Sequence, residues 1–278
     1  MNYLKLILII SILFQLSCKK ETEIEIGIVQ LDVNSDLDSE INRIKNVKEI
    51  KTLNILGVGI EHLDFLANLE EIGDLWIQDC HQLRSLSGLE NVNIYGRLTI
   101  VNCDNLIEIS SLNKVNKLRN LRLSHLKNLL EINGFENLTV VEEDLNISFL
   151  NSLSALEFKN IQEVGGYLGV SNCDGLRNVN FESLVRIGNS LIFSSNLITT
   201  DLILLENLVE LNSLNIISNP KLKNIEGLKN INTVKRIEVR SNQIEDFCPL
   251  KNAILNNAEL ERLNISGNLG MSYFEECD

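Results

Sequence analysis

The chain has 278 residues, enough for one large domain or two small ones, and 44% of them are apolar, which is sufficient for a sizeable core. It contains only two prolines and 15 glycines, which excludes a collagen-like chain and argues against disorder. The net charge of −13 disfavours binding to nucleic acid, because an acidic surface repels phosphates.

Residues 1–17 are predicted to form a lipoprotein signal peptide. Lys5 supplies a positive charge ahead of the apolar run 6–13, and this run is too short to span a membrane as a helix. Ser17 and Cys18 resemble the cleavage box of bacterial lipoproteins, in which the cysteine becomes the lipidated first residue. The alternative is an ordinary signal peptide in which the cysteine is incidental.

The stretch that follows the cysteine resembles a signal for export to the cell surface. Charged residues dominate 19–23, as in surface lipoproteins of Bacteroidetes. The resemblance implies an outer-membrane protein that is lipid-anchored through Cys18 and exposed at the cell surface. Residues 18–29 are then expected to be an anchor and tether, with the lipid as the protein's only contact with the membrane.

The body of the chain is a repeat. An aliphatic residue, any residue and a second aliphatic recur, and Asn or Cys often follows three positions later. The phrase starts at Leu53, Leu75, Leu98, Leu121, Leu145, Leu168, Leu191, Leu214, Ile237 and Leu263. Successive starts lie 22 to 26 residues apart, and six of the nine steps are 23. The pattern predicts a mainly β solenoid of about ten 23-residue coils over residues 30–278, with parallel strands stacked in one sheet.

The position five residues after each start is expected to form a structural ladder inside the turn. It holds Cys80, Cys103, Cys173, Asn196, Asn219, Asn242 and Asn268. Side chains here are expected to satisfy backbone groups that would otherwise be buried unpaired. Cys80 and Cys103 lie within disulfide range, but we favour two buried thiols because ladder side chains run parallel. Val58, Leu126 and Leu150 interrupt the ladder, so their coils are expected to turn differently.

Short helical caps are predicted at both ends of the solenoid. The N-terminal cap covers about 34–46, with Ser35 as the candidate N-cap. The C-terminal cap covers about 246–278 and opens at Cys248, which is followed by a proline that suits a first helical turn. Because an exported protein permits disulfides, we expect Cys248 and Cys277 to be bonded and to close this cap.

Two recurring phrases resemble a known family. The junction Ile72-Gly-Asp-Leu75 recurs at 164–168 and 187–191, and the run 86–92 recurs at 132–138. These phrases resemble the receptor L-domain family, known from ectodomains of insulin- and epidermal-growth-factor-type receptors, and leucine-rich-repeat surface lipoproteins of Bacteroidetes. The resemblance implies a right-handed, leucine-rich-repeat-like β-helix and extracellular recognition, without implying a shared ligand.

The second and fourth positions of the repeated phrase point outward and form the candidate binding face. The candidate binding residues on this face are Trp76, Gln78, Arg122, Glu238 and Arg240. Trp76 is the only tryptophan, and Trp and Arg dominate many interfaces. The alternative for Trp76 is simple packing on its expected sheet neighbours Asn54 and Thr99.

The sequence contains no pattern typical of an enzyme, a cofactor site or a metal site. It lacks Gly-x-Ser-x-Gly, His-Glu-x-x-His and a phosphate-binding loop. His62, His81 and His125 occupy different repeat positions, which argues against a shared zinc site. We therefore expect a surface-anchored binding module, an adhesin or receptor-like protein that recognises a protein or glycan through the solenoid face. The alternative is a structural or assembly component of the cell envelope without a separate ligand.

Overall fold

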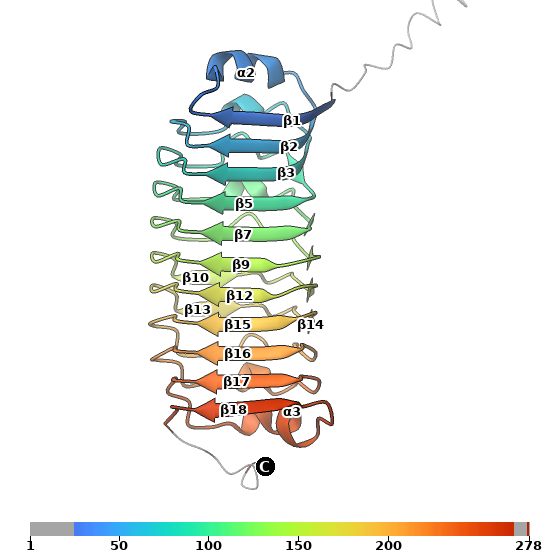
Figure 1. The fold of residues 1–278 in the computed structure, drawn as a ribbon, viewed down its shortest axis with the longest axis vertical. Helices are drawn as coiled ribbons and strands as arrows, with labels where there is room; N and C mark the ends of the chain where they lie inside the picture. Colours follow the sequence, from blue (N-terminus) through green and yellow to red (C-terminus); the bar gives the residue numbers. More distant parts are fainter. Residues whose placement is uncertain (1–24, 270–276, 278) are drawn as a thin grey trace, which may run out of the picture.

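The computed structural model describes residues 25–269 and Cys277. Its main element is a 12-stranded parallel sheet in which the strands stack in chain order along the molecule (Figure 1). In sheet order these are β1 (Glu25–Asp32), β2 (Glu49–Leu56), β3 (Glu71–Gln78), β5 (Arg97–Val101), β7 (Asn120–Ser124), β9 (Leu145–Ser148), β12 (Leu168–Ser171), β15 (Ser190–Ser194), β16 (Ser213–Ile217), β17 (Arg236–Arg240) and β18 (Arg262–Ser266). The twelfth strand, β4 (Asn93–Ile94), pairs with β3 beside this path.

Equivalent repeat positions form columns across the sheet. Leu53 pairs with Leu75, and Leu75 with Leu98, in a register that continues along the whole path. Because side chains alternate between the two faces of a strand, the first and third positions of the phrases point into the core. The last coil is the exception, since Leu263 is 44% exposed. Each phrase start predicted from the sequence lies in a strand of this sheet. The described chain is therefore a repeat solenoid built on one parallel sheet.

The return segments form the second wall of the core with much shorter elements. One small sheet contains β6 (Lys117–Leu118), β8 (Val140–Val141), β11 (Glu163–Val164) and β14 (Arg186–Ile187), and another pairs β10 (Ala155–Glu157) with β13 (Asn178–Asn180). Single 3-10 turns are η1 (Asp64–Leu66), η2 (Ser110–Leu112), η3 (Glu226–Leu228) and η4 (Cys248–Leu250). Leu83, Leu86 and Leu89 are buried at intervals of three residues, which suits tight turns around a narrow core.

A helix lies near each end of the stack (Figure 1): α2 (Leu37–Ile44) beyond β1, and α3 (Lys251–Leu255) beside β18. Ser35 is not the N-cap of α2, contrary to the expectation from sequence. Asp36 holds that position and accepts a hydrogen bond from the Ser39 backbone N–H. The Ser35 hydroxyl is already used, because it donates to the carbonyl oxygen of Asp32 and closes the turn after β1.

The first strand begins earlier than the sequence suggests. We expected residues 18–29 to be tether, but β1 starts at Glu25 and pairs with β2 throughout its length. Val29 and Leu31 are fully buried, so this strand provides the first layer of the core. The predicted signal peptide, Cys18 and residues 19–24 lie outside the described residues.

The far end of the chain is joined covalently to the last coils. Cys248 and Cys277, the pair expected from sequence, form a disulfide with their α-carbons 5.5 Å apart. The Lys251 ammonium also donates to the carbonyl oxygen of Cys277 at 2.6 Å. Within the described residues, no helix has both the length and the apolar composition needed to cross a membrane.

Candidate binding face

In nearly every coil, the residue after the strand adopts the left-handed backbone conformation, with positive φ. This conformation positions the turn that follows the sheet. The non-glycine members of this column all have φ between 54° and 58°: Asp79, Asn102, His125, Phe149, Asn172, Ser195, Ser218 and Ser241. Gly57 adopts the same conformation before Val58. The expectation that the coils of Val58, Leu126 and Leu150 turn differently is therefore wrong. In these coils a buried aliphatic side chain fills the slot that Asn or Cys fills elsewhere.

The asparagine ladder satisfies backbone groups in neighbouring coils. The Asn196 amide donates to the Val170 carbonyl oxygen at 3.1 Å, and its own carboxamide oxygen accepts from the Cys173 backbone N–H at 3.1 Å. Asn219 and Asn242 repeat the arrangement one and two coils further along. Because each amide bridges adjacent coils, the ladder fixes their spacing behind the sheet.

The three ladder cysteines are buried thiols in the structure. Cys173 donates to the Ser171 carbonyl oxygen at 3.4 Å, and burial raises its pKa from 9.0 to about 11. Cys80 donates to the carbonyl oxygen of Gln78 at 3.4 Å, and Cys103 donates to that of Val101 at 3.5 Å. The neighbouring Cys80 thiol, followed by burial, raises the pKa of the Cys103 thiol, whereas Cys103 lowers the pKa of Cys80. Cys103 and Cys173 are therefore held in the protonated form, which makes them poor nucleophiles and suits a structural role.

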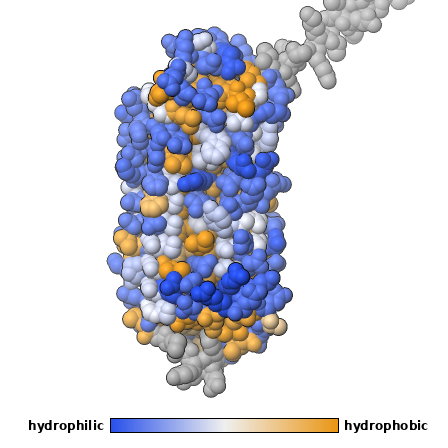
Figure 2. Space-filling model, in the orientation of Figure 1, coloured by the Kyte–Doolittle hydropathy of each residue, from blue (hydrophilic) through white to orange (hydrophobic). Residues whose placement is uncertain are grey.

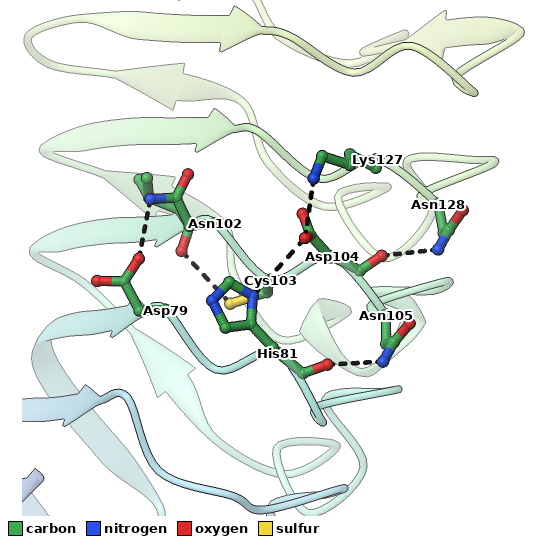
Figure 3. A network of polar contacts seen from close by, with 9 residues as sticks. Asp79, His81, Asn102, Cys103, Asp104, Asn105, Lys127 and Asn128 are labelled. Atoms are coloured by element: carbon green, nitrogen blue, oxygen red, sulfur yellow. Dashed lines mark hydrogen bonds and ion pairs between the residues drawn. The ribbon is translucent and has the colours of Figure 1, made fainter. Parts of the chain in front are cut away.

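Polar contacts tie the coils together at the edge of the sheet (Figure 3). Asp104 accepts from the Lys127 ammonium at 2.9 Å and lies 3.7 Å from the ring of His81. Asn102 donates to the Asp79 carboxylate at 2.8 Å, and this bond lowers the pKa of Asp79. These exposed contacts lie between successive turns, and each side chain already has a partner within the solenoid.

The outward face consists mainly of short polar side chains, interrupted by a few large ones. We use "outward face" for the side of the main sheet formed by the second and fourth phrase positions, together with the residue before each start. Figure 2 shows only small hydrophobic areas over the middle of this face and larger ones toward its two ends. Trp76 is 36% exposed, whereas its neighbour Thr99, on the same face, is only 6% exposed. Large side chains on this face therefore shield the smaller side chains between them from solvent.

The five residues predicted for the binding face differ in their surroundings. Glu238 and Arg240 neutralise each other in an ion pair with Nε and Oε1 2.7 Å apart. Gln78 donates to the carboxylate of Asp79 at 2.9 Å. Arg122 is exposed and has no ion pair with any described residue. Trp76 and Arg122 lie two strands apart in one column, on either side of Thr99.

A buried hydroxyl chain beside Arg122 was not predicted from the sequence. Ser124 and Ser148 are 1% and 7% exposed although they belong to the outward face. Ser148 Oγ donates to Asn146 Oδ1 at 3.0 Å, and Ser124 Oγ lies 2.9 Å from Ser148 Oγ and 2.8 Å from His125 Nδ1. Since each hydroxyl has one proton, Ser124 donates to Ser148, and His125 Nδ1 donates to Ser124. The His125 ring in turn stacks on Phe149, with centroids 4.3 Å apart.

The chain offers little for metal chemistry in the part that the structure describes. Among these residues no group of three or more His, Cys, Asp or Glu side chains is arranged to hold a metal ion.

Residues 37–151 match the family model of the BspA-type leucine-rich repeat region, in six copies. The match supports a leucine-rich-repeat family for this chain and agrees with the repeat solenoid seen in the structure. No curated protein matches the sequence.

Proposed function

We propose that the protein is a cell-surface, lipid-anchored binding module that recognises a protein or a glycan through its outward face. BspA-type repeats support this, because they suggest a repeat protein of a kind often involved in protein binding or surface roles. The observation that carries the proposal is the placement of Trp76 and Arg122. Both are exposed on a floor of short side chains, and Arg122 has no ion pair with a described residue. Trp and Arg that are free in this way are typical anchors of interfaces.

The anchor and the coil geometry belong to the same proposal. Lipidation at Cys18 would hold the solenoid at the outer membrane, since chains inserted in a bilayer give stable attachment. The solenoid is taken as right-handed, because connections between parallel strands are almost always right-handed. The proposed relation to receptor L-domains rests on the recurring phrases that begin at residues 72 and 86. No catalytic role is proposed.

Binding of partners to the soluble protein, residues 19–278, tests the proposal. The protein is used in pull-downs from host or environmental extracts and on a glycan array, and each interaction found is measured again with Trp76→Ala and Arg122→Ala. We expect both variants to weaken the interaction and Arg177→Ala, an exposed arginine outside the main sheet, to leave it unchanged. An interaction untouched by both sheet-face variants would place recognition elsewhere and overturn the proposal.

A second candidate function is assembly of the cell envelope without a separate ligand. It is favoured by the two outermost strands, β1 and β18, because each pairs with only one other strand within the described residues. Unpaired strand edges are templates for association with another chain. Light scattering of residues 19–278 would then show oligomers that grow with concentration, whereas a monomer at all concentrations would contradict this candidate.

A further inference from the structure

The hydroxyl chain fixes which way the Asn146 side chain presents its amide group. Asn146 Oδ1 accepts from Ser148, so Nδ2 with its two protons points the other way. A β-carbon added at Gly169, in the neighbouring strand, would stand 3.0 Å from this nitrogen. Asn146 Nδ2 donates to no other described residue. The sheet face therefore holds a free amide donor whose orientation is set by buried groups.

Tyr167 lies on the other side of the same glycine. The added β-carbon at Gly169 would be 3.3 Å from Cε2 of its ring, so the ring covers a place where any side chain would intrude. Burial, followed by the charge of Asp144, raises the pKa of Tyr167, while the charge of Arg122 acts in the opposite direction. The phenol is therefore protonated at neutral pH, and its hydroxyl has no hydrogen-bond partner among the described residues.

Arg122 completes a group of three donors. It pairs in register with Asn146, which pairs in turn with Gly169. The carboxylate of Asp144, beside Tyr167, already accepts from the backbone N–H of Tyr167 at 2.9 Å. Three donors without a partner in the solenoid, on neighbouring strands of one face, suit an acceptor with several lone pairs, and a carboxylate supplies them.

We propose that Arg122, Asn146 and Tyr167 form a site for the carboxylate of an acidic glycan, with the sugar chain lying along the column toward Trp76. This rests on the proposed function and names the class of ligand. A glycan fits better than a protein because the middle of the face lacks the large apolar patch that the core of a protein interface uses (Figure 2). The exposed ring of Trp76 and the ring of Tyr167 offer flat surfaces for sugar C–H groups instead.

The test uses acidic oligosaccharides with uronic or sialic acid residues and the same oligosaccharides after reduction of the carboxyl groups. Residues 19–278 are probed on an array of both sets, and hits are measured by calorimetry. We expect the acidic form to bind at least tenfold more tightly than the reduced form, because hydrogen bonds to a charged group exceed those to a neutral one. Arg122→Gln should remove most of this preference, whereas Arg122→Lys should keep part of it.

Two further variants separate a binding role from a structural one. Tyr167→Phe keeps the ring over Gly169 and removes only the hydroxyl, so we expect a loss of roughly 2- to 12-fold in affinity with unchanged thermal unfolding. Arg177→Gln, the matched arginine control, should bind like the parent protein. Equal affinity for acidic and reduced sugars, or an Arg122→Gln variant that binds normally, would overturn the proposal.

A failure of this inference is distinct from a failure of the proposed function. A protein or a neutral glycan that binds, and is lost with Trp76→Ala, would contradict the acidic-glycan site while leaving the sheet face as the recognition surface. Ligands that bind with no effect of any sheet-face variant would contradict both.

Discussion

The side-chain amide of Asn219 donates to the carboxamide oxygen of Asn242 across 3.0 Å and also to the carbonyl oxygen of Phe193 in the preceding strand at 3.0 Å. One side chain thus connects three successive coils. Its own carboxamide oxygen accepts from the backbone N–H of Asn196 at 3.1 Å. All of these groups are buried, so none can turn to water if Asn219 is lost.

Asn219→Ala is therefore expected to lower the free energy of unfolding by about 2–4 kcal/mol, because buried groups left without partners cost roughly 1–3 kcal/mol each. Urea denaturation followed by circular dichroism measures the change. Asn219→Cys should cost less, since thiols already donate to carbonyl oxygens at this position in other coils. Asn215→Ala, on the outward face of the strand that precedes Asn219, is the control and should change stability by less than about 0.5 kcal/mol. If Asn219→Ala and Asn215→Ala are equally stable, the asparagine ladder does not stabilise the solenoid.

Gly88→Ala is expected to destabilise the turn between β3 and β4 by more than about 2 kcal/mol. Gly88 has φ of +102°, and an added β-carbon would stand only 2.1 Å from the Leu63 carbonyl oxygen. Gly27→Ala is the matched control, because a β-carbon there would meet no atom within 4 Å. Thermal unfolding of both variants checks the comparison, and a Gly88→Ala protein as stable as Gly27→Ala would be the contrary result.

The positions of the strands along the chain could be predicted, because two aliphatic residues mark every strand of the repeat at a nearly constant interval. The residues with positive φ after the strands could not be predicted. They range from Asp79 to Phe149 and share a backbone conformation but no side-chain chemistry. Strand β1 was missed because its turn leads into helix α2 rather than into a leucine-rich return segment.

The candidate site could be predicted only in part. Trp76 and Arg122 are recognisable as large side chains at outward positions. Tyr167 precedes the repeated phrase, and the roles of Asn146 and Ser148 depend on hydrogen bonds between strands that sequence spacing does not specify. Pairing of Glu238 with Arg240 likewise depends on side-chain conformation.

Stability should fall as the pH rises above about 9, partly because of Cys173. Burial raises the pKa of this thiol from 9.0 to about 11, so between these values the unfolded chain loses the proton first. The folded state then holds more protons, and stability decreases with pH. Full loss would be on the order of 2–3 kcal/mol. Urea midpoints from pH 8 to 11 should fall less steeply in Cys173→Ala than in the parent protein, and parallel curves would contradict the assignment.

Loss of the Cys248–Cys277 disulfide is expected to lower stability by about 2–4 kcal/mol, because the bond closes a segment between residues 29 positions apart. The double variant Cys248→Ala/Cys277→Ala should unfold at a lower temperature than the oxidised parent protein. Dithiothreitol should lower the unfolding temperature of the parent protein and leave that of the double variant unchanged. If dithiothreitol lowers the unfolding temperature of both proteins equally, the loss of stability does not come from reduction of this disulfide.

Trp76 makes the role of the outward face directly measurable, because it is the only tryptophan in the chain and is partly exposed there. Quenching of its fluorescence by acrylamide is measured in residues 19–278, with and without a saturating ligand whose binding is established by calorimetry. We expect the bound ligand to shield Trp76 and to reduce the quenching constant. A ligand that binds fully while the quenching of Trp76 stays unchanged would show that recognition does not occur on this face of the sheet.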